Sequence, residues 1–372
     1  MKILICVEFY DPHVGGAEKH CKLIAEYLKK NNHKVEIATT FLNERKKKII
    51  NGIKINTFNI KGNFIRGYYG EITNYQNFLI NSNFDKIIFY AAQQWSFDLS
   101  LEIINKINSE LTLVPCGFSK LKNIFYKPYF LLLQNKINKL NKVICLSKNY
   151  QDYFFCKKFF KKKTNVIYNG SENFFFGKKG FRKKFKILDD EIMLLYLSNI
   201  KYMKGQDRLI NIVRKIRNKQ KITLIFIHAN NVSLLYLIFL KILILISTFN
   251  NNIRIKILKN LNEKDKISAV SECDYFVSTS RLECSPLTMF EAMAAGKIYL
   301  GTNVGNCMEI QKKIKTGFIS NNTNLILKKI ELMIGKKIHN EKKTSNKIYS
   351  YFKKNHDWKI LLKKYEKLII QT

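Results

Sequence analysis

The sequence predicts an α/β protein of two domains, each built on a mostly parallel sheet with helices on both faces. Short apolar, β-prone runs alternate with helical patterns along most of the chain, which is typical of parallel sheets. This alternation begins near Lys2 and begins again near Ile192, on either side of a stretch without a clear period. The chain has 372 residues, which is enough for two hydrophobic cores of ordinary size.

The first half opens as a β-α-β unit. Residues 2–10 are apolar, the pair Gly15-Gly16 follows, a helical pattern extends to about residue 30, and a strand is predicted at 34–40. Further strand-like runs follow at 53–58, 86–92, 111–116, 142–147 and 165–168. We assign residues 1–172 to an N-terminal domain.

The second half repeats this pattern after residues 173–186, which mix phenylalanine, glycine and lysine and are interpreted as the link between the domains. Strands are predicted at 192–197, 222–227, 253–258 and 275–277, with helices from about 205 and at 263–270. These elements place a C-terminal domain at 187–350. The last residues, 351–372, have a lysine-rich helical pattern.

One segment, 232–247, is almost entirely apolar and permits two interpretations. It is shorter than the roughly 20 residues that span a bilayer, and it contains Lys241. A helix in the core or in a domain interface is the favoured interpretation, and a helix lying in a membrane interface is the alternative. Residues 154–163, which alternate aromatic pairs with lysines, are consistent with either surface binding or an ordinary solvated face.

The charge balance restricts the partners. Lys and Arg total 65 against 28 Asp and Glu, a formal net charge of +37. Such a charge favours polyanions, namely nucleic acid, an anionic membrane surface or phosphorylated ligands. The eight cysteines form no C-x-x-C pair, so we expect buried thiols in a reducing cytosol rather than disulfides or a metal site. The N-terminus has no signal-peptide pattern, which also favours a cytoplasmic protein.

The stretch 275–309 carries the clearest candidate site. A strand is followed by a loop and a helix, with Ser285 as the expected N-cap and Pro286 at the first helical position. The free N–H groups of Leu287 and Thr288, together with the helix dipole, favour an anion such as a diphosphate.

Two carboxylates and one lysine accompany this anion site. Glu283 lies in the loop before the helix and Glu291 lies just over one turn into it, so we expect them to reach groups on opposite sides of a bound phosphate. Lys204 follows the strand predicted at 192–197 and precedes Gly205, which allows close backbone approach. Taken without the other site residues, Lys204 is better explained as a solvated surface charge.

Several of these motifs, taken together, resemble a known family. Gly15-Gly16-Ala17-Glu18, the sequence VIYNG at 166–170, Ser198-Asn199 through Lys204-Gly205, and Glu283-x7-Glu291 with EAMAAG occur in the order found in GT-B glycosyltransferases of family 4. The resemblance implies two Rossmann-like domains facing a cleft, with the last helix crossing back to the N-terminal domain. It also implies a hexosyltransferase that retains anomeric configuration, uses a nucleotide-diphosphate sugar as co-substrate and needs no bound metal or other cofactor.

The resemblance also implies roles for individual residues. Glu283 corresponds to the glutamate that contacts the donor sugar, and Glu291 to the one that accepts hydrogen bonds from the ribose. Lys204 corresponds to the lysine that binds the donor phosphates. Gly15 and Gly16 correspond to the glycine loop that closes over the diphosphate or acceptor.

This chain departs from the family pattern at two positions. Asn199 occupies a donor-site position where relatives often carry arginine, so one positive charge is missing. After the 111–116 strand, Gly117-Phe118 stands where many relatives have histidine. Leaving-group stabilisation is therefore expected to depend more heavily on Lys204 and the helix start.

Three residues of the N-terminal domain are candidates for the acceptor site. His13 lies beside the glycine loop, and Gln94 and Trp95 follow the strand at 86–92, on the edge where ligands bind in open α/β sheets. Aromatic rings stack on sugar faces and amides bond hydroxyl groups. His13 as a solvated turn residue and Trp95 as a packing residue are the alternatives.

These observations predict a retaining glycosyltransferase in cell-envelope glycan synthesis, acting on lipopolysaccharide, capsule or another lipid-linked oligosaccharide at the cytoplasmic membrane face. A nucleotide-sugar epimerase or a phosphorylase with the same cleft is the alternative. A basic nucleic-acid-binding protein is a further one, but no nucleic acid partner is expected because no recognition module is present in the sequence.

Overall fold

The computed structural model describes residues 1–371 except Val14, Phe174, 218–219, 230–231, 248–251 and 336–341. The chain forms two compact units. Unit 1 comprises Met1–Tyr168 and Leu362–Thr372, and unit 2 comprises Asn169–Leu361. The segment predicted as a link, 173–186, is counted with unit 2, where it contains the short helix α7 (Phe181–Lys184).

Unit 1 is built on an eight-stranded sheet with the order β10-β9-β8-β7-β1-β2-β4-β3, in which only the pair β3–β4 is antiparallel. Its strands are β1 (Lys2–Cys6), β2 (Lys34–Thr40), β3 (Ile49–Ile50), β4 (Ile53–Phe58), β7 (Lys86–Tyr90), β8 (Glu110–Val114), β9 (Lys142–Cys145) and β10 (Thr164–Val166). The central strand β7, KIIFY, is buried along its whole length, because helices cover both faces of the sheet.

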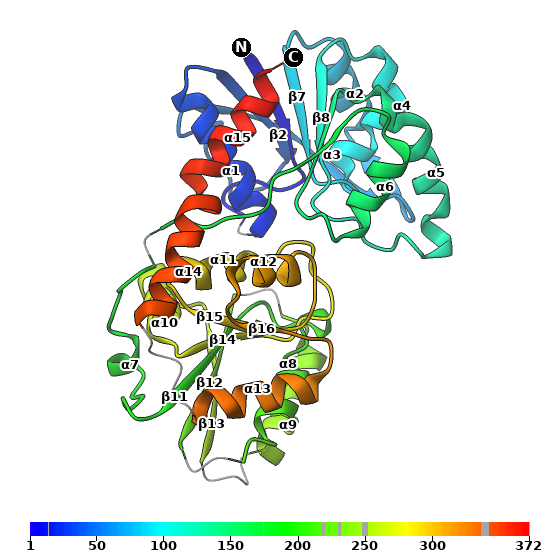
Figure 1. The fold of residues 1–372 in the computed structure, drawn as a ribbon. Coiled ribbons are helices and arrows are strands. Elements are labelled where there is room, and N and C mark those ends of the chain that lie inside the picture. The colour runs from blue at the N-terminus through cyan, green and yellow to red at the C-terminus, as the bar shows by residue number, and fades with distance from the viewer. Residues whose placement is uncertain are drawn as a thin grey trace. The chain divides into compact units, whose positions relative to one another are not determined.

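The helices of unit 1 follow the crossover pattern of a parallel sheet (Figure 1). They are α1 (Gly16–Lys30), α2 (Ile72–Ile80), α3 (Trp95–Asp98), α4 (Ser100–Ile103), α5 (Lys127–Lys136) and α6 (Gln151–Phe159), with the 3-10 turns η1 (Ile104–Lys106), η2 (Ile124–Tyr126) and η3 (Ile137–Lys139). Helix α1 buries one face, on which Cys21, Ile24 and Leu28 lie at helical spacing. Lys29 and Lys30 lie in its last turn, where positive charge interacts favourably with the helix dipole.

A two-stranded antiparallel hairpin lies outside the main sheet of unit 1. It consists of β5 (Ile60–Asn63) and β6 (Gly67–Gly70). The sequence pattern did not indicate this hairpin, because only Ile60 of its strands is fully buried.

Unit 2 contains a six-stranded, fully parallel sheet with the order β13-β12-β11-β14-β15-β16. Its strands are β11 (Ile192–Leu197), β12 (Ile222–His228), β13 (Ile253–Lys259), β14 (Tyr275–Ser278), β15 (Ile298–Gly301) and β16 (Phe318–Ile319). The order reverses between β11 and β14, so the loops after these two strands lie next to each other at the carboxyl edge.

The helices of unit 2 cover both faces of this sheet (Figure 1). They are α8 (Gln206–Val213), α9 (Leu234–Ser247) and α13 (Thr323–Gly335) on one face, and α10 (Glu263–Glu272), α11 (Leu287–Ala294), α12 (Cys307–Ile314) and α14 (Lys342–Asn355) on the other, with the 3-10 turn η4 (Tyr202–Lys204). The prediction of an α/β protein with mostly parallel sheets in two domains is confirmed.

Helix α9 corrects one part of the favoured interpretation of the apolar segment 232–247, namely its place in the core. Within the helix, Tyr236 and Leu240 are buried. The other large apolar side chains of its outer face are exposed, namely Leu234, Leu235, Ile238, Phe239, Ile242, Leu245 and Ile246. α9 is therefore not a core helix. No helix in the described part of the chain has the length and hydropathy that crossing a bilayer requires.

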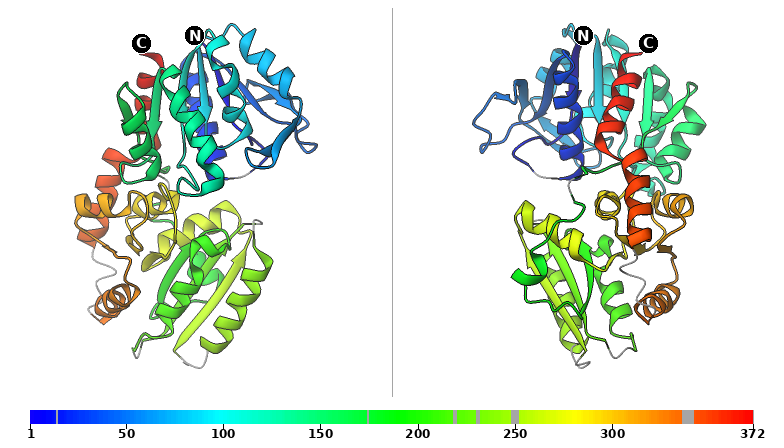
Figure 2. Two further views of the ribbon diagram at one scale, coloured as in Figure 1. Left: turned by 90° about the vertical axis from the view of Figure 1, so that its right-hand side faces the viewer. Right: turned by 60° about the vertical axis from the view of Figure 1, so that its left-hand side comes forward.

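The last helix, α15 (Trp358–Ile370), is shared between the units, because residues from Leu362 onward are counted with unit 1. There it lies beside α1 in the views of Figures 1 and 2. Glu366 of α15 accepts hydrogen bonds from Tyr27 Oη (3.3 Å) and Asn31 Nδ2 (2.6 Å), while Tyr365 is buried against His20.

Candidate active site

The central contact of the candidate site is an ion pair between Lys204 and Glu283. Lys204 lies at the end of η4 after β11, and Glu283 lies in the loop after β14, so two paired strands bring together residues 79 positions apart. Lys204 Nζ bonds Glu283 Oε1, and Ser280 Oγ donates to the same oxygen at 3.0 Å. The two side chains are 28% and 18% exposed, so the pair remains open to a ligand.

The loop that carries Lys204 is fixed against the loop after β14 at Gly205. Gly205 has a left-handed conformation with φ +65°, and a Cβ there would lie 2.2 Å from Thr279 O. Thr279 Oγ1 donates to Gly205 O at 2.7 Å. Tyr196 Oη donates to Lys204 O and lies 2.8 Å from Ser280 Oγ. Lys204 is therefore held on a rigid turn, where an added side chain at Gly205 would not fit.

Arg281 supplies a second connection between the two loops, which sequence reasoning missed. Its guanidinium donates to both carboxylate oxygens of Asp207 (2.8 and 2.6 Å) and to Tyr202 O (2.7 Å), and it stacks over the Tyr202 ring at 3.8 Å. Burial by itself would raise the pKa of Asp207, but hydrogen bonds from Arg281 and Tyr236 and the charge of Arg281 lower that pKa below its ordinary value. Arg281 thus positions the loop that carries Lys204.

The start of α11 differs from the predicted cap. The helix begins at Leu287, with Pro286 rather than Ser285 at the N-cap. Ser285 does not cap the helix because its atoms bond elsewhere: Ser285 Oγ accepts from Asn306 Nδ2 at 2.9 Å, and Ser285 O accepts from Asn169 Nδ2 at 2.7 Å. These two buried amides hold the loop between Glu283 and the helix.

The anion-binding groups at the start of α11 remain available. In the part of the chain that the structure describes, the backbone N–H groups of Leu287 and Thr288 make no hydrogen bond. They lie at the positive end of the helix dipole. Glu291 lies on the same helix and is half-buried.

Gly305 supports the loop from the other side. It has φ +51°, and a Cβ there would lie 2.0 Å from Cys284 O and 2.9 Å from Glu283 O. The turn before α12 therefore packs directly on the backbone of the Glu283 loop, and only glycine permits this approach.

Asn199, predicted at the donor site, lies in the loop after β11. Its carbonyl oxygen accepts from Gln206 Nε2 at 2.8 Å, and Gln206 also donates to Ser198 Oγ at 3.0 Å. Gln206 is fully buried, so it fixes the backbone of this loop while the Asn199 side chain is half-buried.

The glycine turn of unit 1 forms the start of α1. Gly15 is the N-cap residue in an extended conformation, and Gly16 is the first helical residue. His13 stacks on Phe9 and lies 3.3 Å from a carboxylate oxygen of Glu18, with a side chain that is 44% exposed. His13 is thus an exposed residue at the carboxyl edge of the unit 1 sheet.

Gln94 and Trp95 are neighbours in sequence but differ in accessibility. Gln94 Oε1 accepts from the backbone N–H of Glu8 at 3.4 Å and is half-buried. Trp95 is 1% exposed, and its Nε1 donates to Thr40 Oγ1 at 2.9 Å. The prediction that Trp95 contacts the acceptor is wrong, because its ring is enclosed in the core of unit 1.

Two carboxyl groups near this edge were not found from the sequence. Burial, and then the charge of Glu18, raise the pKa of Glu8 to about 7. Burial also raises the pKa of Asp98 to about 7, although Tyr68 and Tyr129 donate to it at 2.6 and 2.9 Å. The sequence offered only one indication of these two carboxyl groups, namely that each follows a buried strand. Any polar residue at such a position gives the same indication.

Among the described residues, no group of three or more His, Cys, Asp or Glu side chains is placed to hold a metal ion. The candidate site is thus composed of Lys204, Glu283, Glu291 and the amides of Leu287 and Thr288, all in unit 2.

The family comparison falls on this unit. Residues 177–355 match the family model described as Glycosyl transferases group 1, and they include every one of these site residues. No curated protein sequence matches the chain at a significant level.

Solved structures match along nearly the whole chain. Sucrose-phosphate synthase from Thermosynechococcus elongatus has a TM-score of 0.81 at 13% identity, covering 99% of this chain and 98% of that one. Anabaena HepE in complex with UDP-glucose has a TM-score of 0.77 at 16% identity, covering 99% of both chains. WaaG, a glycosyltransferase involved in lipopolysaccharide biosynthesis, has a TM-score of 0.71 at 14% identity, covering 100% of both.

These similarities define the class of the protein as a GT-B fold glycosyltransferase. Residues 177–355, within unit 2, are similar to the glycosyl transferases group 1 family.

Proposed function

We propose that the protein is a retaining, metal-independent hexosyltransferase that moves a sugar from a nucleotide-diphosphate sugar to an acceptor hydroxyl. The observation that carries this proposal is the Lys204–Glu283 pair beside the free N–H groups at the start of α11. A cation and two amides suit a diphosphate, and a carboxylate next to them suits the sugar attached to it. The complex of HepE with UDP-glucose supports a donor of this class.

Donor binding would exchange the partner of Lys204. In the free chain, its ammonium group is neutralised by Glu283. The diphosphate carries more charge and also reaches the amides of Leu287 and Thr288, so it displaces the carboxylate from Lys204. This exchange leaves Glu283 beside the donor sugar, still oriented by Ser280 Oγ. Glu291, which lies further along α11, accepts hydrogen bonds from the ribose.

The transfer step needs stabilisation of the leaving group more than a base. The bond between the anomeric carbon and the diphosphate oxygen breaks, and its electron pair leaves with the diphosphate. Lys204 and the two amides stabilise that charge where it develops. The acceptor oxygen bonds the anomeric carbon from the same face, and its proton passes to the departing phosphate oxygen. Glu283 stabilises the positive charge that develops on the sugar.

The acceptor is proposed to bind at the carboxyl edge of the unit 1 sheet, where His13 and Gln94 lie near the turn formed by Gly15 and Gly16. We propose a lipopolysaccharide, capsule or other lipid-linked glycan as acceptor, at the inner face of the cytoplasmic membrane. The net charge of +37 supports an anionic surface as partner, and WaaG offers a precedent of similar fold in lipopolysaccharide biosynthesis.

The substitution Glu283→Gln tests this function. We expect sugar transfer to fall about 100- to 1000-fold, because one oriented charge at the reacting centre is lost. Donor affinity should change little. The donor is first identified by thermal shift with UDP-, GDP- and ADP-sugars, and transfer is then followed by product mass. Glu44→Gln, at an exposed loop position of unit 1, is the matched control and should transfer normally.

Unchanged transfer by the Glu283 variant would refute the assigned role. Turnover of the sugar nucleotide without any acceptor would instead favour an epimerase, and turnover that requires free phosphate would favour a phosphorylase. Stereochemistry is read from the anomeric configuration of the product, and an inverted product would contradict retention.

A further inference from the structure

One surface of unit 1 combines dense positive charge with exposed apolar side chains. It is formed by η2, α5, α6 and the turns beside them, within residues 119–163, and is called the lysine–apolar surface below. None of its residues belongs to the candidate active site.

The charge of this surface has one sign only. Residues 111–171 contain twelve lysines and a single acidic residue, Asp152. Asp152 is fully buried, so it contributes no exposed negative charge. Ten of these lysines are exposed, including Lys122, Lys127 and Lys158. Solubility alone does not explain why this surface has no exposed acidic residue, because a surface with both signs of charge would be equally soluble.

The same surface contains an apolar groove. Its volume is about 720 Å³, and its lining includes Ile124, Phe130, Leu131, Phe154 and Phe155. Three of these side chains are highly exposed, with 76% of Ile124, 50% of Leu131 and 59% of Phe154 accessible. Exposed apolar side chains of this size, gathered around one groove, indicate a surface that is covered in the functional state.

Lysines line the groove together with its apolar side chains. Lys122, Lys127 and Lys158 are among the groove's own lining residues. Lys158 Nζ lies 5.2 Å from the ring centre of Phe159, and Lys120 Nζ lies 4.9 Å from that of Tyr126. Lysines beside exposed apolar and aromatic side chains are typical of the boundary between hydrocarbon and headgroups.

From this geometry we infer that the lysine–apolar surface docks unit 1 on an anionic phospholipid bilayer. The lysines contact headgroup phosphates, and an acyl chain enters the groove between α5 and α6. The inference deepens the proposed membrane-linked acceptor and rests on that proposed function. Nucleic acid fits less well, because aliphatic side chains such as Ile124 and Leu131 offer no stacking partner for bases.

The charge component is tested with vesicles of phosphatidylcholine and phosphatidylglycerol, using sedimentation of the full chain at low salt. We expect the triple variant Lys122→Gln, Lys127→Gln and Lys158→Gln to bind about 100-fold more weakly, since each lysine near an anionic surface contributes roughly fivefold. Pure phosphatidylcholine vesicles should retain little of either protein. Full binding by the triple variant would overturn the inference.

A matched control removes the same charge elsewhere in unit 1. Lys46, Lys47 and Lys48 are exposed and lie beside β3, at the opposite edge of the sheet from β10. Their triple glutamine variant has the same net charge as the test variant, and we expect it to bind vesicles within about threefold of the unaltered chain. Equal loss in both variants would show a general charge effect and would refute a localised surface.

The groove is tested by the double variant Ile124→Ser and Phe154→Ser, which keeps every charge. We expect its vesicle affinity to fall about 100-fold, because two large side chains no longer enter the hydrocarbon. The control is Leu235→Ser with Leu245→Ser on α9, whose outer face is apolar but carries only Lys241 as a charge. If the α9 variant lost binding and the groove variant kept it, α9 would be the membrane contact instead.

Two further measurements separate the surface from the transferase function. Each variant is tested for nucleotide-sugar binding by thermal shift, which reports on folding and on unit 2. Normal donor binding with lost vesicle binding supports the inference, whereas failure of donor binding in the unaltered chain bears on the proposed function alone. Loss of duplex DNA binding without loss of vesicle binding would assign the surface to nucleic acid.

Discussion

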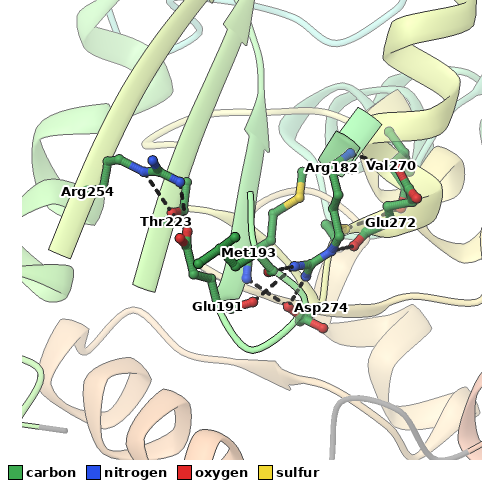
Figure 3. A network of polar contacts seen from close by, with 10 residues as sticks. Arg182, Glu191, Met193, Thr223, Arg254, Val270, Glu272 and Asp274 are labelled. Atoms are coloured by element: carbon green, nitrogen blue, oxygen red, sulfur yellow. Dashed lines mark hydrogen bonds and ion pairs between the residues drawn. The ribbon is translucent and has the colours of Figure 1, made fainter. Parts of the chain in front are cut away.

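The two edges of the unit 2 sheet both hold buried or half-buried charges, but they use them differently. The carboxyl edge carries the Lys204–Glu283 pair, and the amino edge carries the network shown in Figure 3. In that network, Arg182 donates to Asp274 (2.6 Å), to Glu272 O (3.2 Å) and to Glu191 O (3.1 Å).

At the amino edge, the charged groups bond the ends of the strands. Asp274 Oδ2 also accepts from the backbone N–H of Met193 at 2.7 Å, at the start of β11. Glu191 accepts from Thr223 on β12 and from Arg254 on β13, at 2.5 and 2.8 Å. The three guanidinium nitrogens of Arg182 all donate to the protein. This network therefore has little capacity left for a ligand.

At the carboxyl edge, some hydrogen-bonding groups have no partner among the described residues. Glu283 Oε1 takes the bonds from Lys204 and Ser280, while Oε2 accepts none within the described part of the chain. The amides of Leu287 and Thr288 likewise stay open. Charge alone therefore does not mark a functional site in this unit. A functional site is better recognised by hydrogen-bond donors and acceptors that have no protein partner and lie beside an ion pair.

The largest expected effect is on stability, at the amino edge. Arg182→Ala should lower the free energy of unfolding by about 3–5 kcal/mol, because the buried Asp274 carboxylate loses its cationic partner. Urea unfolding followed by circular dichroism measures this change. Lys313→Ala is the control, because the exposed Lys313 forms an i,i+4 pair with Glu309 on α12, and it should cost about 0.5 kcal/mol or less. An equally small loss for Arg182 would erase the distinction between the two edges.

The next effect is on activity, at the carboxyl edge. Lys204→Met should reduce turnover about 100-fold, because the leaving diphosphate loses its cation. The melting temperature should change by no more than a few degrees, since the pair is partly exposed. Lys201→Met, exposed in the same loop, serves as the control with normal turnover expected. A large stability loss with normal turnover would place Lys204 among the structural ion pairs.

A smaller effect is expected for the donor ribose contact. Glu291→Gln should weaken nucleotide binding about tenfold, because a charged hydrogen-bond acceptor becomes a neutral one. Isothermal titration of the cognate nucleotide gives the dissociation constant directly. Glu263→Gln, at an exposed position on α10, is the control. Nucleotide affinity equal to that of the unaltered chain would remove Glu291 from the donor site.

The smallest effect concerns pH. The pKa of Asp207 is lowered below its ordinary value of 3.8, so its ion pair with Arg281 contributes stability above that pH and loses it as the pH falls through the folded pKa. The unaltered chain should therefore lose stability between about pH 5 and about pH 3. In the Asp207→Asn variant this loss of unfolding free energy should be smaller, by about 1 kcal/mol or less. An unchanged difference would mean that Asp207 is not held by Arg281 in solution.

The general architecture and part of the site were predictable from local patterns. Buried parallel strands give continuous apolar runs, and the reversal of strand order places the loops after β11 and β14 together. Lys204 and Glu283 were assigned to one site through the family resemblance, and the strand order then shows why they are neighbours.

The remaining features depend on contacts between distant residues. Asp207 and Arg281 are 74 positions apart, and no spacing in the sequence relates them. Ser285 has the side chain of an N-cap, yet Asn306 takes its hydroxyl oxygen. Trp95 follows a strand as a ligand residue would, but Thr40 of β2 holds its ring nitrogen inside the core. The predictions for Ser285 and Trp95 failed where a tertiary hydrogen bond overrode a local preference.

The division of α15 between the units has a consequence for the order in which the chain can fold during synthesis. Unit 1 is translated first, but its residues from Leu362 onward emerge last, after all of unit 2. Until then, the positions that Tyr365 and Ile369 cover stay open, and both side chains are about 1% exposed in the finished unit. The first unit to leave the ribosome is therefore the last to be completed.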